Sequence, residues 1–260
     1  MKFYLDLLRK SWAALTRNPG LAFGAALLAR LPSLILYVLN RTGVLVRDSS
    51  LSNTLISMLV LLVGDLLGPG LVIICLKLLR GESARLTDLL RGLRFAGRYL
   101  LAILLMELMF IALLAVVILL ALIGLIGTSA AADVFAVVLM IAFYLLLESL
   151  YGLFGQAVVD RDTSGPVDAL RRSRAILRGH RRRFVPLAVL TLLSLTPLYL
   201  LAREQSPEAY LIATVLGAVV FILSLALYSA FYEAVRPADP KGPSRGQLRK
   251  ARRTAGSTGV

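Results

Sequence analysis

The chain has 260 residues, of which 58% are hydrophobic, and its mean hydropathy is +0.80. Its 29 Lys and Arg outnumber its 15 Asp and Glu, which gives a formal net charge of +14. This composition excludes an ordinary soluble domain and a disordered basic chain, so we expect the bilayer to be its solvent.

Six apolar stretches are long enough to cross a bilayer as helices. In chain order they cover about residues 20–39, 54–78, 100–127, 131–159, 184–202 and 210–235. We therefore expect an all-α integral membrane domain over residues 1–236, with six transmembrane helices in three hairpins. Residues 237–260 are rich in Pro, Gly, Ser and basic residues, which predicts a disordered basic cytoplasmic tail.

The basic residues alternate between the connections. The N-terminal segment, the second and fourth connections and the tail hold nearly all Lys and Arg, whereas the other three connections hold only Arg41, Arg47 and Arg203. The positive-inside rule then predicts a multi-pass protein of the cell membrane with both termini in the cytoplasm. Because this topology explains the arginines, we expect no nucleic-acid partner.

A short pattern recurs ahead of each pair of apolar stretches. Its three copies are Asp6-Leu7-Leu8-Arg9, Asp88-Leu89-Leu90-Arg91 and Asp168-Ala169-Leu170-Arg171. The period predicts three units, each an amphipathic cytoplasmic helix followed by a helical hairpin. Since each unit crosses the membrane an even number of times, all three units point the same way, and any pseudo-symmetry axis lies along the membrane normal.

The third copy is strongly amphipathic. Leu170, Ser173, Ile176 and Leu177 fall on one helical face. This pattern is typical of a helix that lies in the membrane interface with basic residues toward anionic headgroups. Seven arginines are candidates for contact with anionic inner-leaflet lipids or with a membrane protein partner, although they would serve equally to set topology: Arg171, Arg172, Arg174, Arg178, Arg181, Arg182 and Arg183.

Four ionisable residues fall inside the apolar stretches, namely Arg30, Asp65, Glu107 and Glu148. Counting from the predicted cytoplasmic ends at ~1.5 Å per residue places all four roughly 12 to 20 Å deep. Charges at that depth usually face the interior of a helix bundle and find partners. We therefore predict an intramembrane polar cluster in which Arg30 pairs with at least one acid.

Hydroxyl groups are expected to complete this cluster. Tyr144 and Tyr151 lie four residues before and three after Glu148, on the same helical face. The cluster has two interpretations, a device that fixes helix packing or a path for protons or substrate. The segment 64–70, Gly-Asp-Leu-Leu-Gly-Pro-Gly, supports the second, because broken helices at the midplane often form transporter sites. Glycines equally permit close helix packing.

Recognisable catalytic chemistry is missing from the sequence. The only cysteine is Cys75 and the only histidine is His180, so neither a disulfide nor a metal or cofactor site is expected. The sequence contains no Gly-x-Ser-x-Gly elbow and no Walker-type loop. We therefore expect a protein that is not an enzyme.

Residues 167–179, Val-Asp-Ala-Leu-Arg-Arg-Ser-Arg-Ala-Ile-Leu-Arg-Gly, are followed by Arg183, Phe184 and an apolar run. This segment resembles one in the membrane domain found ahead of some glycerophosphoryl diester phosphodiesterases, and in related stand-alone families of multi-span bacterial and archaeal membrane proteins. Arg174 departs from the family pattern, which often has an aromatic residue there. The resemblance implies an integral membrane module, mostly of unassigned function. No soluble stretch can hold the hydrolase domain, so we expect no phosphodiesterase activity.

Two functions fit these patterns. The first is a non-enzymatic membrane scaffold that interacts with lipids or protein partners. The alternative is a small transporter or lipid-handling protein that uses the intramembrane carboxylates.

Overall fold

The computed structural model describes residues 2–41, 64–122, 130–160, 165–203 and 206–236, and each regular element in these ranges is a helix. The helices are α1 (Lys2–Thr16), α2 (Pro19–Arg41), α4 (Gly68–Leu79), α5 (Thr87–Arg91), α6 (Leu93–Leu122), α7 (Ala130–Tyr151), α8 (Phe154–Asp160), α9 (Pro166–Arg178), α10 (Arg181–Arg203) and α11 (Pro207–Val235).

Within the described residues, four helical segments are long and apolar enough to cross a membrane. They are Pro19–Leu36, Leu93–Val116, Val137–Asp160 and Glu208–Val235. These segments match the first, third, fourth and sixth predicted spans. The all-helical class is confirmed, with four helices compatible with a membrane protein. The stretch 184–202 forms most of α10, and the second half of the stretch 54–78 forms α4. Residues 54–63 and the predicted tail 237–260 lie outside the described residues.

The predicted span 131–159 is not one continuous helix, because a turn at Gly152 and Leu153 separates α7 from α8. A Cβ on Gly152 would lie 2.7 Å from the Phe184 ring and 2.4 Å from Glu148 Oε2. Glycine therefore lets the buried Phe184 side chain approach the break. The backbone N–H of Leu153 donates to Ser173 Oγ of α9 at 3.1 Å, which satisfies a donor at the interruption.

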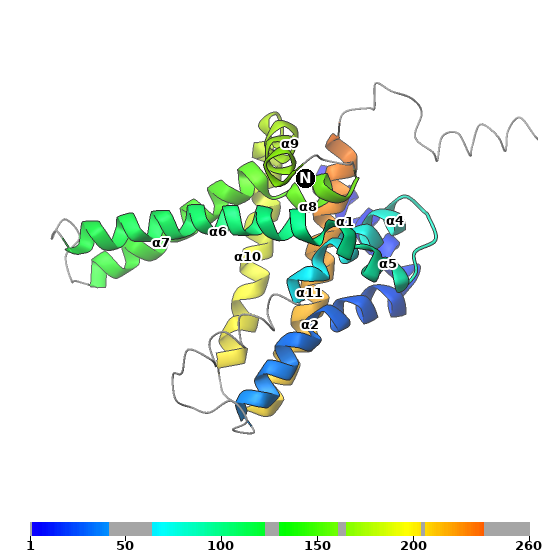
Figure 1. Cartoon of the computed structure of the whole chain (residues 1–260), viewed down its shortest axis with the longest axis horizontal. Helices are drawn as coiled ribbons and strands as arrows, with labels where there is room; N and C mark the ends of the chain where they lie inside the picture. The colour runs from blue at the N-terminus through cyan, green and yellow to red at the C-terminus, as the bar shows by residue number, and fades with distance from the viewer. Residues whose placement is uncertain (1, 42–63, 123–129, 161–164, 204–205, 237–260) are drawn as a thin grey trace, which may run out of the picture.

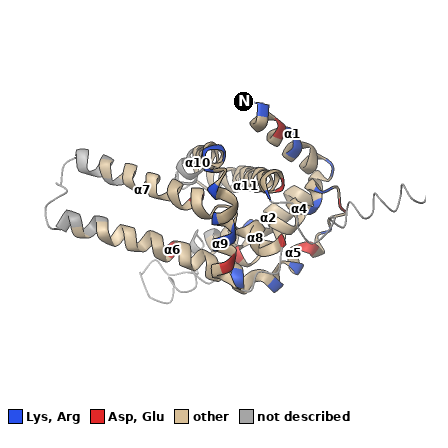
Figure 2. Cartoon of the chain, turned by 90° about the horizontal axis from the view of Figure 1, so that it is seen from above, with Lys and Arg blue, Asp and Glu red and all other residues tan. Residues whose placement is uncertain are grey.

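Two groups of long helices diverge from a common junction (Figure 1). Helices α6 and α7 run side by side as one arm, while α2 and α10 accompany α11 in the other direction. The shorter helices α1, α4, α5, α8 and α9 gather at the junction, and the charged residues concentrate there (Figure 2). The arms are almost uncharged in their described parts, as expected for surfaces that face lipid.

Small side chains let α2 pack closely against α11. Ala22, Ala25 and Ala26 are completely buried and belong to the same core cluster as Ala218 and Ile222 of α11. Close backbone approach of this kind is typical of helix contacts within membranes, where apolar burial alone provides little driving force between helices.

The three copies of the repeated pattern begin α1, α5 and α9, which we call the repeat helices. Each packs against the last helical segments of another unit: α5 on α4, α9 on α7 and α8, and α1 on α11. The long helix that follows each repeat helix also contacts another unit: α6 contacts α4, α10 contacts α7, and α2 contacts α11. The contacts therefore close cyclically, as a threefold repeat would require.

The buried positions of α1 and α9 coincide in the repeat. Leu7, Ser11, Ala14 and Leu15 are buried in α1. Their equivalents in α9 are Ala169, Ser173, Ile176 and Leu177, and all four are buried. Neighbouring helices of the protein cover these positions, so this face of the predicted interfacial helix is not in contact with lipid. Amphipathic periodicity identifies a face that avoids water but not the surface that covers it.

Candidate functional site

Glu148 occupies a half-buried position near the end of α7. The hydroxyl of Tyr144, one turn earlier, donates to Glu148 Oε1 at 3.3 Å, as their spacing predicts. The second carboxyl oxygen, Oε2, is buried and has no hydrogen-bond partner in the described part of the chain. A buried carboxyl oxygen without a partner is unfavourable unless the group is protonated or binds water or a ligand.

Two tyrosines that sequence reasoning missed also face this region. Tyr228 of α11 interacts electrostatically with Glu148 and Tyr144. Tyr99 of α6 is within electrostatic range of both Asp65 and Glu148. Its hydroxyl would be 2.9 Å from a Cβ placed on Gly68, which puts it against the start of α4. Tyr99 and Tyr228 are far from Glu148 in the sequence, so no local pattern could have indicated that they lie near it.

Arg30 lies partly buried on α2, with its guanidinium carbon 4.8 Å from the centre of the Phe221 ring. Its Nε is buried and has no hydrogen-bond partner among the described residues. Asp65 lies within electrostatic range of Arg30, but no ion pair within 4.0 Å joins Arg30 to a described acid. The predicted direct ion pair is therefore absent from the described residues, and a cation–π contact stabilises Arg30 instead.

The other predicted members of the cluster are placed differently. Asp65 and Glu107 are exposed rather than enclosed, although they interact electrostatically with each other. Tyr151 lies on the last turn of α7, and its hydroxyl makes no hydrogen bond to Glu148 in the described residues. The cluster thus consists of a half-buried Glu148 site and a more open site around Asp65, with Tyr99 within electrostatic range of both acids.

A separate ion-pair network joins the ends of α4, α8 and α11. Arg80 contacts both Asp160 and Glu233, and Arg236 contacts the same two acids at 3.2 and 3.0 Å. The Tyr232 hydroxyl donates to Asp160 at 3.0 Å. Arg80 and Asp160 hold equivalent positions in the repeat, eight residues before Asp88 and Asp168. The network therefore lies where the cyclic arrangement brings the units together.

The charge of Arg80 is maintained by this network. Burial alone would lower the pKa of its guanidinium, but the hydrogen bonds and negative charges of Asp160 and Glu233 raise that pKa above its ordinary value. All charged groups of the network therefore have partners. Such satisfied pairs fix the geometry of a junction more readily than they bind a further ligand.

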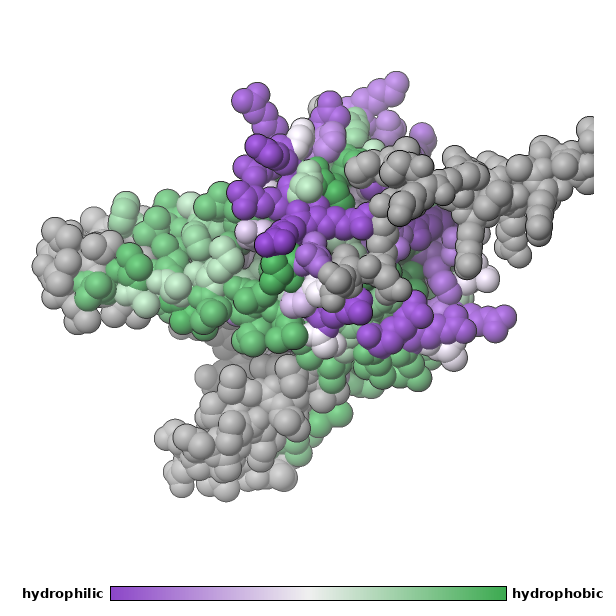
Figure 3. Space-filling model, turned by 45° about the horizontal axis from the view of Figure 1, so that its top comes forward, coloured by the Kyte–Doolittle hydropathy of each residue, from purple (hydrophilic) through white to green (hydrophobic). Residues whose placement is uncertain are grey.

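The seven candidate arginines lie on α9 and on the start of α10. None forms an ion pair within 4.0 Å with an acidic side chain of the described part of the chain. Hydrophilic residues gather around the junction and adjoin the hydrophobic surface of the α6–α7 arm (Figure 3). The arginines thus form a positively charged surface without acidic partners within 4.0 Å in the described ranges, which we call the basic face.

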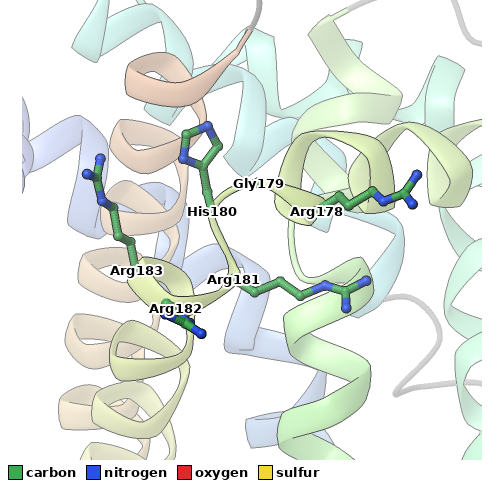
Figure 4. A pocket seen from close by; sticks show the side chains of 6 residues that line it. All are labelled: Arg178, Gly179, His180, Arg181, Arg182 and Arg183. Atoms are coloured by element: carbon green, nitrogen blue, oxygen red, sulfur yellow. The ribbon is translucent and has the colours of Figure 1, made fainter.

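Part of the basic face is hollowed. Arg178, Gly179, His180, Arg181, Arg182 and Arg183 line an open hollow of about 530 Å³ between the end of α9 and the start of α10. Arg178 and Arg181 point to the same side of the Gly179–His180 turn, whereas His180 and Arg183 lie on the other side (Figure 4). Arg183 is placed over the Phe3 ring of α1, with 5.4 Å between the guanidinium carbon and the ring centre.

The described residues contain no group of three or more His, Cys, Asp or Glu side chains able to hold a metal ion. The sole cysteine, Cys75, is buried in the core of α4. The arrangement can therefore bind anions at the basic face and hold a proton or a polar ligand near Glu148. No family model, curated protein or solved structure matches this chain.

Proposed function

We propose that this protein is a non-enzymatic, six-span membrane protein of the cell membrane that binds anionic lipids or a protein partner through its basic face. Both termini lie in the cytoplasm, and the spans form three hairpins related by the repeat. We further propose membership of the stand-alone membrane proteins related to the phosphodiesterase membrane domain. The contacts described above support the repeat, and the α9 segment carries the proposed relationship.

One observation carries the proposal: the arginines of the basic face have no acidic partners in the described residues and adjoin the apolar arms. A protein that used these arginines only to stabilise itself would pair at least some of them, as it does with Arg80 and Arg236. Each unpaired cation near an anionic bilayer contributes about 1 kcal/mol to attraction, so the face has a strong preference for anionic lipid.

Topology is tested by cysteine labelling in a Cys75→Ser background. Single cysteines at Arg174 on α9 and at Ser206, the N-cap of α11, mark the two ends of α10. We expect an impermeant maleimide to label R174C only in inverted vesicles and S206C only in right-side-out cells. Labelling of both positions from the same side would contradict the proposed crossing by α10.

Lipid preference is tested on protein reconstituted in phosphatidylcholine with phosphatidylglycerol. We expect phosphatidylglycerol to be enriched around the wild-type protein at low salt, and less so around Arg171→Gln/Arg172→Gln/Arg174→Gln, because diffuse charge attraction is screened by salt. A protein partner would be detected as co-purification that the same variant loses. Equal lipid enrichment and equal partner recovery for wild type and variant would refute the proposed role of this face.

The transporter alternative is favoured by one specific feature: Glu148 Oε2 has no partner in the described ranges and lies beside Tyr144 and a break in the helix. If Glu148 takes part in transport, proton-coupled flux into liposomes should vanish in Glu148→Gln and persist in Glu107→Gln, whose carboxyl group is exposed. Asp65→Asn tests the second acid in the same way. Flux that requires these acids would replace the scaffold proposal.

A further inference from the structure

We propose that the hollow between α9 and α10 holds the phosphate of one anionic phospholipid, with Arg178, Arg181 and Arg182 as its ligands. This inference rests on the proposed lipid-binding function and narrows it from a charged surface to a single built site. The basic face as a whole attracts lipid diffusely, whereas the hollow retains one molecule.

The hollow brings cations from two helices together. Arg178 ends α9 and Arg181 begins α10, and the short turn between them contains Gly179, where a Cβ would meet nothing within 4 Å. The two guanidinium groups point to one side of the turn (Figure 4), so a phosphate between them can accept hydrogen bonds from both. Because Arg183 is engaged with Phe3, it does not compete for this position.

One hydrogen-bond donor at the hollow lacks a partner among the described residues. The Nε of Arg181 is buried without an acceptor there. A buried donor without an acceptor is unfavourable. The hollow also adjoins the start of α10, where the positive end of the helix dipole favours an anion. A phosphate in the hollow can accept a hydrogen bond from Arg181 Nε and lie at this positive end.

The surface below the hollow favours a lipid over a free anion. Arg182, Pro186, Leu190 and Leu193 follow one another along the exposed face of α10. Leu190 and Leu193 are 52% and 63% exposed. A phosphate at the hollow thus has an apolar strip beneath it, on which an acyl chain can lie. A soluble phosphate would leave this strip uncovered.

The test is native mass spectrometry of detergent-purified full-length protein with phosphatidylglycerol, compared with phosphatidylcholine and with inorganic phosphate. The variant is Arg178→Gln/Arg181→Gln. The control is Arg171→Gln/Arg174→Gln, which removes the same charge from exposed positions of α9 that do not line the hollow. Both variants are first checked for native helicity and monodispersity.

We expect the wild type and the control to retain one phosphatidylglycerol after a high-salt wash, and the hollow variant to bind it about 30-fold more weakly, the loss expected for two cations near an anionic headgroup. Equal weakening of phosphatidylglycerol binding in both variants would contradict a specific site in the hollow. It would leave the diffuse preference for anionic lipid in place. Competition by inorganic phosphate at the lipid's own concentration would overturn the lipid as ligand. Absence of any preference for phosphatidylglycerol would overturn the proposed lipid function as well.

Discussion

Helices α1 and α9 carry the same repeat and bury the same positions, yet they meet different partners. Ser173 of α9 faces the break between α7 and α8 and accepts a hydrogen bond from Leu153 N–H. Ser11 is its equivalent in α1, a helix that packs on the continuous helix α11, and the Ser11 hydroxyl oxygen is buried without a partner among the described residues. The repeat therefore determines which face is buried, and the partner determines what a polar side chain on that face does.

The third repeat helix, α5, differs from α1 in the environment of its aspartate. Its Asp88 is fully buried and contacts Lys77 at 2.8 Å and Arg91 at 3.0 Å, whereas the equivalent Asp6 of α1 is exposed. α5 approaches α4 through glycines, since a Cβ on Gly92 would lie 2.1 Å from the backbone nitrogen of Gly70. Equivalent residues thus have different structural roles in the three copies.

The largest effect is expected from Gly92→Ala. The added methyl group would collide with backbone rather than with a flexible side chain, so α5 must move away from α4. We expect the apparent free energy of unfolding, measured in mixed micelles, to fall by about 3 kcal/mol. Gly97→Ala is the control, because a Cβ there meets nothing within 4 Å, and it should stay within about 1 kcal/mol of wild type. Equal stability of the two variants would argue against the close contact.

A smaller loss is expected from Asp88→Asn. This change weakens the bonds from Lys77 and from the Arg85 backbone N–H and leaves the cations without their anion. Because the Arg91 side chain is 67% exposed, its ion pair with Asp88 contributes little to stability. We expect the free energy of unfolding to fall by about 2 kcal/mol in total. Asp6→Asn, at the exposed equivalent position, should leave the free energy of unfolding unchanged.

The same carboxylate predicts a pH dependence. Burial opposes ionisation of Asp88, but hydrogen bonds from Lys77 and Arg85 and the charges of Lys77 and Arg91 together lower its pKa below the ordinary value. Its contribution to stability is therefore complete above the unfolded value of about 3.9 and is lost as the pH falls through the lower folded value. Below about pH 4, the gap in stability between wild type and Asp88→Asn should narrow. A constant gap would show that ionisation of Asp88 is irrelevant.

Ser173→Ala tests the role of the serine at the helix break. The substitution leaves a buried Leu153 N–H without an acceptor, which should cost about 1.5 kcal/mol. Hydrogen exchange of residues 151–155 should accelerate, because this bond protects the turn. Unchanged exchange would indicate that the turn is held by packing alone.

The smallest effect, with the opposite sign, is expected from Ser11→Ala. Removing a buried hydroxyl without a partner should leave the free energy of unfolding unchanged or raise it by about 0.5 kcal/mol. A loss as large as that of Ser173→Ala would remove the distinction between α1 and α9, and would imply that Ser11 has an acceptor of its own.

Much of the fold was predictable because its signals are local. Apolar run length identified the membrane class, and 3.6-residue periodicity identified Leu170, Ser173, Ile176 and Leu177 as one face, all of which are buried. The contact of Tyr144 with Glu148 followed from helical spacing. The proximity of Tyr99 to Asp65 and Glu148 could not be predicted from local spacing, because the fold brings these distant segments together.

By itself, the sequence determined the all-helical class, the positions of most helices and the buried register of the repeat, since all three depend on the hydropathy of neighbouring residues. Only the tertiary structure decided that helices rather than lipid cover the buried faces of α1 and α9. It also decided that Gly152 interrupts a span and that Arg178 and Arg181 flank one hollow. These features depend on contacts between distant segments, whose free energies no local pattern encodes.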